Sequence, residues 1–159
     1  LNPCDGLSAG NLPAGLEKIF VYSLCWSVAG LLETDDRKKF DTWLRERDTN
    51  NILPSVQENE TIYEYFVESK TCEWKKWVPQ KWTYPQGEQK LDFSNLLVPT
   101  MDSTRSMYII ETIHQQKIPV LIVGAEGTAK TSVQLMFLAR QDPAHMMTKR
   151  MNFSSATTP

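Results

Sequence analysis

The chain has 159 residues, 41% of them hydrophobic, so its length and composition suit one domain with a core of useful size. Acidic residues number 19 and basic residues 17, giving a net charge of −2. This balance gives no electrostatic footprint for nucleic acid or an anionic membrane, and we expect neither as a partner. Cys4, Cys25 and Cys72 lack metal-ligand spacing, which is typical of reduced thiols in a cytosolic protein.

Residues 1–50 have the pattern of two helices and no sheet. Apolar residues recur at helical spacing from Leu16 to Leu31, which predicts a helix with a wide apolar face. The most apolar run, Ile19 to Leu32, is shorter than the roughly 20 residues that a membrane-spanning helix needs. A second helix is expected to begin at Thr34 or Asp35, either of which can cap it. Its apolar stripe is formed by Phe40, Trp43 and Leu44.

Residues 51–90 predict a connector that contains a β-hairpin. Two runs rich in β-branched and aromatic residues, Thr61 to Val67 and Cys72 to Val78, flank a short polar turn. The tryptophans of this part could form a stacking surface for bases, but there is too little positive charge nearby. We expect them instead to cover the junction between two subdomains. These tryptophans are Trp74, Trp77 and Trp82.

Residues 91–159 predict the beginning of a doubly wound α/β domain. The expected elements are a helix over 103–115 capped by Asp102, a buried parallel strand over Val120–Val123, a helix over 130–140 and a next strand over Met151–Ser154. The expected fold class is therefore α/β: an incomplete doubly wound sheet, preceded by helices and a hairpin.

The turn between the expected strand and helix carries the strongest motif. Residues 124–131 read Gly-Ala-Glu-Gly-Thr-Ala-Lys-Thr, against the phosphate-loop pattern G-x-x-x-x-G-K-[ST]. They match it at Gly124, Lys130 and Thr131 and depart from it at Ala129, where glycine is usual. Alanine has a cost there only if the residue needs a positive φ or the space that Cβ fills, so we expect the loop to survive. The alternative is an ordinary strand-to-helix turn with a stray Lys-Thr pair.

This loop predicts a site for ATP or ADP with Mg²⁺. Its amides would surround phosphate oxygens at a helix N-terminus, Lys130 would reach the β- and γ-phosphates, and the Thr131 hydroxyl would ligate Mg²⁺. The expected phosphate-site residues are Gly124, Glu126, Gly127, Thr128, Ala129, Lys130, Thr131 and Ser132.

Hydrolysis needs an acidic residue after a second apolar strand, to hold the metal and position water. The only acidic residue after Lys130 is Asp142, and no apolar strand precedes it. We therefore assign no catalytic residue, and we do not expect this chain to hydrolyse ATP alone.

Several segments together resemble dynein heavy chains. Phe20–Val28 and Asp36–Arg45 resemble the end of the second ATPase module, and Val98–Arg105 resembles the segment that opens the third. The hairpin from Tyr63 to Trp77 is similar to the dynein segment joining these modules, and Gly124–Thr131 lies where the third phosphate loop belongs. The resemblance covers nearly the whole chain, with its motifs in the correct order.

The resemblance implies part of an AAA+ ring motor that walks on microtubules. Residues 1–50 would be the helical lid of one module, 51–90 the connector and 91–159 the N-terminal part of the next module. Val98, Pro99 and Thr100 would lie near the adenine of a regulatory third site. The metal-binding acid would lie beyond Pro159.

The family also implies partners and a location. The partners would be the remaining AAA+ modules, the microtubule, and the intermediate and light chains. Ala-Lys-Thr in the loop is similar to some axonemal outer-arm chains, which favours the axoneme of the cilium within the cytoskeleton.

Two other functions fit parts of the sequence. One is a structural connector between modules that binds no nucleotide by itself. The other is a small independent P-loop enzyme such as a nucleotide kinase, which would need a metal-binding acid and substrate-binding arginines after Lys130.

Overall fold

The computed structural model describes residues 12–83 and 96–151. The chain divides into two compact units, residues 1–77 and 78–159, and each is described by itself. Within the described ranges, no helix is both long and apolar enough to cross a membrane.

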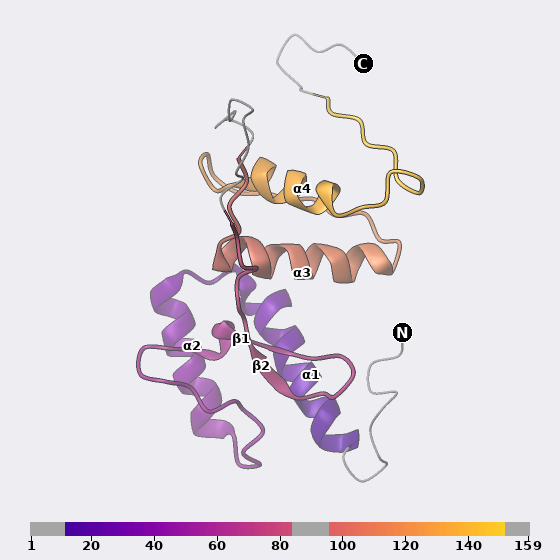
Figure 1. Ribbon diagram of the computed structural model, residues 1–159. Helices are drawn as coiled ribbons and strands as arrows, with labels where there is room; N and C mark the ends of the chain where they lie inside the picture. Colours follow the sequence, from indigo (N-terminus) through magenta and orange to yellow (C-terminus); the bar gives the residue numbers. More distant parts are fainter. Residues whose placement is uncertain (1–11, 84–95, 152–159) are drawn as a thin grey trace. The chain divides into compact units, whose positions relative to one another are not determined.

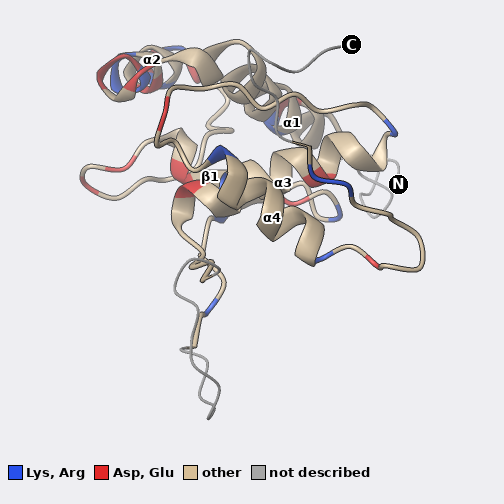
Figure 2. Cartoon of the chain, turned by 90° about the horizontal axis from the view of Figure 1, so that it is seen from above, with Lys and Arg blue, Asp and Glu red and all other residues tan. Residues whose placement is uncertain are grey.

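The first unit begins with the helices that the sequence predicts (Figure 1). They are α1 (Leu12–Ser27), the short 3-10 helix η1 (Ala29–Leu31) and α2 (Thr34–Arg47). Thr34 is the first residue of α2 rather than its cap; Glu33 precedes the helix in an extended conformation and makes no side-chain cap. Asp35 and Asp36 lie in the first turn of α2 and two arginines in the last, where the helix dipole favours each charge. Figure 2 shows both signs of charge along this helix.

The predicted hairpin is confirmed, with shorter strands than the sequence pattern suggests. After η2 (Ile62–Glu64), β1 (Tyr65–Val67) pairs antiparallel with β2 (Trp74–Lys76). The pairing runs from Tyr65 opposite Lys76 to Val67 opposite Trp74. Cys72 turns the chain back with a φ of 52°.

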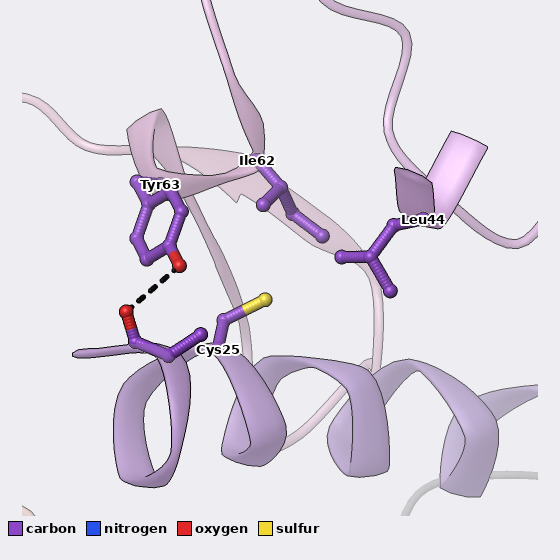
Figure 3. Packing of buried hydrophobic residues seen from close by; sticks show 5 residues of the cluster. Cys25, Leu44, Ile62 and Tyr63 are labelled. Atoms are coloured by element: carbon purple, nitrogen blue, oxygen red, sulfur yellow. Dashed lines mark hydrogen bonds between the residues drawn. The ribbon is translucent and has the colours of Figure 1, made fainter. Parts of the chain in front are cut away.

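The helices α1, η1, α2 and η2 share one hydrophobic core, and Trp74 of the hairpin packs partly against it. Its buried members are Cys25, Ala29, Leu44, Ile62 and Tyr63. The Tyr63 hydroxyl donates a hydrogen bond of 3.0 Å to the Ala29 carbonyl, as Figure 3 shows. Burial, with a smaller contribution from Asp41, raises the pKa of the Cys25 thiol to about 12, so this thiol stays protonated at neutral pH. The boundary expected at residue 50 stays a prediction, although Ile62 and Tyr63 on its far side pack with the helices.

Two polar networks tie the first unit together. The buried Asp41 carboxylate accepts hydrogen bonds from the Arg45 guanidinium, at 2.7 and 3.2 Å, and from the Ile62 amide, at 2.7 Å. The Arg37 guanidinium donates to the carbonyls of Leu32 and Gly30, and its charge lies 4.7 Å from the Tyr63 ring centre. Both networks give buried polar groups the partners that water would otherwise supply.

The second unit is built on two helices that lie side by side, α3 (Met101–Gln115) and α4 (Lys130–Ala139) (Figure 1). Their shared core consists of Met107, Ile110, Val133 and Phe137. The expected Asp102 cap is wrong. Thr100 caps α3 by accepting a bond from the Ser103 amide, while Ser103 bonds back to the Thr100 amide. Asp102 lies in the first turn, where its negative charge interacts favourably with the helix dipole.

The expected strand over Val120–Val123 does not form a sheet in this structure. The only sheet among the described residues is the β1–β2 hairpin, so this segment has no strand beside it. Ile122 packs partly against the α3–α4 core, whereas Leu121 and Val123 are 86% and 81% exposed. A buried parallel strand needs neighbours to pair its backbone groups. The next expected strand is not seen at Met151, and residues 152–154 lie outside the described ranges. The described residues of the second unit fit part of an α/β domain and contain no strand of its sheet.

Candidate phosphate-binding loop

The candidate site is the loop of residues 124–129, which leads directly into α4. Two residues in the left-handed region turn the chain into the helix: Gly127 with φ of 73° and Ala129 with φ of 57°. Glycine adopts this conformation freely, whereas an alanine is strained in it. The loop therefore keeps a tight bend at position 129 even though the residue there is not glycine.

The N-terminus of α4 is left without a side-chain cap. Ala129 occupies the cap position and makes no side-chain hydrogen bond. The Val133 amide donates to the Ala129 carbonyl at 3.0 Å as the helical ladder begins. The amides of Lys130, Thr131 and Ser132 precede that bond and have no acceptor within the helix. This end of α4 can donate hydrogen bonds to an anion and is favoured by negative charge.

The Lys130 side chain folds over the loop. Its ammonium group donates to the carbonyls of Gly124, at 2.9 Å, and Ala125, at 2.5 Å, and to the Thr128 hydroxyl, at 3.2 Å. The Thr128 hydroxyl in turn donates to the Ala125 carbonyl at 2.8 Å. The positive charge thus lies within the loop that the motif identified.

Gly124 leaves room for the Thr128 side chain, a role that the motif does not state. A Cβ added at this position would lie 2.9 Å from the Thr128 hydroxyl oxygen, closer than real Cβ contacts allow. The glycine therefore makes room for a side-chain contact across the loop. The sequence indicates both residues, but not that the side chain of one occupies the space beside the other.

The remaining predicted residues are placed as follows. Glu126 and Thr131 are exposed, and Ser132 is half-buried in the first turn of α4. Val98 and Pro99 lead into α3, and the hydrogen bonds described for Thr100 all go to the first turn of that helix. The structure thus joins Gly124, Thr128 and Lys130 by contacts. It describes no contact between the 98–100 segment and the loop.

The side chains near the loop are suited to a Mg²⁺ ion that is held mainly by phosphate oxygens. Among the residues that the structure describes, no three His, Cys, Asp or Glu side chains gather into a metal site. Mg²⁺ in nucleotide sites usually keeps several waters and takes one or two protein ligands besides phosphate oxygens. The exposed Thr131 hydroxyl, in the first turn of α4, is of the type that provides such a ligand.

Comparison with known proteins assigns both halves of the chain. A family model described as "Dynein heavy chain AAA lid domain" matches residues 3–79, and one described as "P-loop containing dynein motor region" matches residues 85–159. This chain belongs to the dynein heavy chain family. The resemblance found in the sequence is confirmed, and the change of family model between residues 79 and 85 follows closely on the unit boundary at residues 77 and 78.

Curated dynein heavy chains match along most of the sequence. Human "Dynein axonemal heavy chain 8" is 37% identical over 169 residues, covering 100% of this chain and 4% of the relative. "Dynein gamma chain, flagellar outer arm" of Chlamydomonas reinhardtii is 36% identical over 149 residues, covering 92% of this chain and 3% of the relative. Mouse "Dynein axonemal heavy chain 5" is 35% identical, with 92% and 3% covered. The chain thus spans a few per cent of the length of these dynein relatives.

Proposed function

We propose that this chain is part of an ATP-dependent microtubule motor and carries the nucleotide-binding loop of a regulatory AAA+ module. The loop belongs to the third module, and the first unit contains the helical lid of the second. The single observation that carries this proposal is the Lys130 ammonium group held in the loop, directly before the uncapped N-terminus of α4. The match of residues 85–159 to a P-loop dynein region supports it.

In this proposal each part of the site has a separate task. The amides from Gly127 to Ser132 donate to the phosphates of ATP or ADP, and the Thr131 hydroxyl holds Mg²⁺, which screens the phosphate charge. The Lys130 ammonium exchanges its bonds to the loop carbonyls for bonds to the β- and γ-phosphates. Val98, Pro99 and Thr100 border the adenine. No described residue is assigned to activate water, so the role proposed for the site is to hold nucleotide and regulate the motor.

The relatives suggest where such a motor works. Their names are those of axonemal and flagellar dyneins, so we place this chain in the axoneme of a cilium or flagellum. Its proposed partners are the other AAA+ modules, the microtubule, and the intermediate and light chains.

The test is Lys130→Ala in the complete heavy chain. Removing the ammonium group takes away the positive charge that bonds to the loop carbonyls, and nucleotide-dependent release from microtubules is expected to change. The measurement is the dissociation of the motor from microtubules over a range of ATP concentrations. Lys149→Ala, at another exposed lysine of the same unit, is the matched control. Identical release by wild type and Lys130→Ala would reject a regulatory site here.

A structural connector that binds no nucleotide is the second candidate, and one observation favours it. The Lys130 ammonium already has three acceptors within the loop, so the loop is stable without an anion. This candidate predicts that Lys130→Ala leaves release unchanged, so the same experiment decides between the two functions.

A further inference from the structure

The ammonium group of Lys130 has as many acceptors as it has protons. A lysine ammonium carries three N–H donors. Its acceptors here are the Gly124 carbonyl at 2.9 Å, the Ala125 carbonyl at 2.5 Å and the Thr128 hydroxyl at 3.2 Å. Thr128 supplies the one side-chain acceptor of the three, and it is the one that a substitution can remove without changing the backbone.

Thr128 is itself held in place from two sides. Its hydroxyl donates its proton to the Ala125 carbonyl at 2.8 Å, which directs the oxygen lone pairs toward the lysine. Gly124, which faces the same oxygen, leaves just enough room for it, because a Cβ there would approach within 2.9 Å. Gly124, Ala125 and Thr128 therefore fix the position of one hydroxyl oxygen.

We propose that Thr128 is a positioning residue: its hydroxyl holds the Lys130 ammonium group at the mouth of the loop before nucleotide binds. The value of this arrangement for phosphate binding rests on the proposed function. A long lysine side chain loses considerable rotamer freedom when it is fixed. If the side chain is already fixed, less conformational entropy is lost when phosphate binds. The hydroxyl at position 128, which the phosphate-loop pattern leaves open, thus has a defined task in this chain.

The test measures the reactivity of Lys130 in the complete heavy chain, freed of nucleotide. Acylation of a lysine needs a deprotonated amine with an exposed lone pair, so each hydrogen bond donated by the ammonium group slows the reaction. A limiting amount of N-hydroxysuccinimide acetate is added, and acetylation at Lys130 is followed by peptide mass spectrometry. Lys117, exposed after α3, is the internal reference.

Two substitutions remove the hydroxyl and one keeps it. Thr128→Val preserves the side-chain shape, Thr128→Ala removes it, and both are expected to raise acetylation of Lys130 about three- to ten-fold, the range for one net hydrogen bond. Thr128→Ser retains the hydroxyl and is expected to restore the slow rate, while acetylation of Lys117 stays the same in all variants. Unchanged acetylation of Lys130 in Thr128→Val, or an equal rise in Thr128→Ser, would overturn the proposal.

A double-mutant cycle with Gly124 independently tests the hydrogen bond between Lys130 and the Thr128 hydroxyl. Gly124→Ala should displace the Thr128 hydroxyl and raise acetylation of Lys130 in the wild-type background. In the Thr128→Ala background the nearest atom to the new Cβ is Lys130 Cδ at 3.7 Å, an ordinary contact, so the same substitution should add little. Fully additive effects would count against the proposal.

The result is separable from the proposed function. All these rates are measured without nucleotide, so they report the loop alone. A further sample with Mg-ATP tests nucleotide binding: protection of Lys130 supports the proposed function, and equal acetylation with and without Mg-ATP argues against it, whatever the outcome at Thr128.

Discussion

Ala129 is the residue at which this chain departs from the usual phosphate-loop pattern, and the structure shows what the departure costs. With φ of 57° and ψ of 20°, it lies in the left-handed region. An alanine is costly at this position if its φ is positive, and the φ of Ala129 is positive. The strain is of the order of 1 kcal/mol, small enough for the loop to tolerate.

Ala129→Gly is expected to stabilise the start of α4 by up to about 1 kcal/mol, because glycine adopts a positive φ without strain. Slower amide hydrogen exchange in the first turns of α4 would report the gain. Ala125→Gly is the control, because Ala125 has no positive φ and glycine there only adds freedom to the unfolded chain. Equal exchange in wild type and Ala129→Gly would show that position 129 carries no strain.

At the scale of elements, local patterns predicted local structure well. The spacing of apolar residues located α1 and α2, and the hairpin followed from two short β-rich runs around a polar turn. The predicted start of α3 after an Asp102 cap was wrong, because Thr100, two residues earlier, is also of a type that caps helices. Only the reciprocal bonds between Thr100 and Ser103 decide between them.

The strand expected over Val120–Val123 shows the limit of such reasoning. Four consecutive apolar residues indicate burial, but a strand also requires partners that a local pattern does not contain. Likewise, the motif selected Lys130, but the acceptors of its ammonium group depend on how the loop bends. The bend of the loop also places the Thr128 side chain beside Gly124, which the motif alone does not predict.

Asp41 links α2 to η2, the short helix before the hairpin, and Asp41→Ala is expected to destabilise the first unit by roughly 2–4 kcal/mol. The change leaves the Ile62 amide without its acceptor and the Arg45 guanidinium without its carboxylate. Urea unfolding followed by tryptophan fluorescence would measure it. Asp36→Ala breaks an exposed ion pair with Lys39 and should have a much smaller effect, because solvent screens exposed ion pairs. Similar losses from both substitutions would mean that the Asp41 network contributes little.

At the scale of the whole molecule, the 159 residues are a small part of the chains they resemble. We expect this chain by itself to bind ATP weakly, with a dissociation constant well above about 1 μM, or not detectably. The phosphate loop and the segment proposed to border the adenine are present, but in the proposed motor further contacts to base and ribose come from other parts of the ring, and without them less binding energy is available to offset the entropic cost. Isothermal titration calorimetry measures this directly. Sub-micromolar binding would show that the chain already contains a complete nucleotide site.

The core that α1, α2 and η2 share determines how this region can be divided. If the polypeptide stopped at Asn50, it would lack Ile62 and Tyr63, and the surfaces of Cys25, Ala29 and Leu44 that they cover would face water. Recombinant versions meant to isolate the lid should therefore extend through Trp77, the last residue of the first compact unit. What the sequence presents as a helical pair followed by a linker is therefore expected to unfold as one piece.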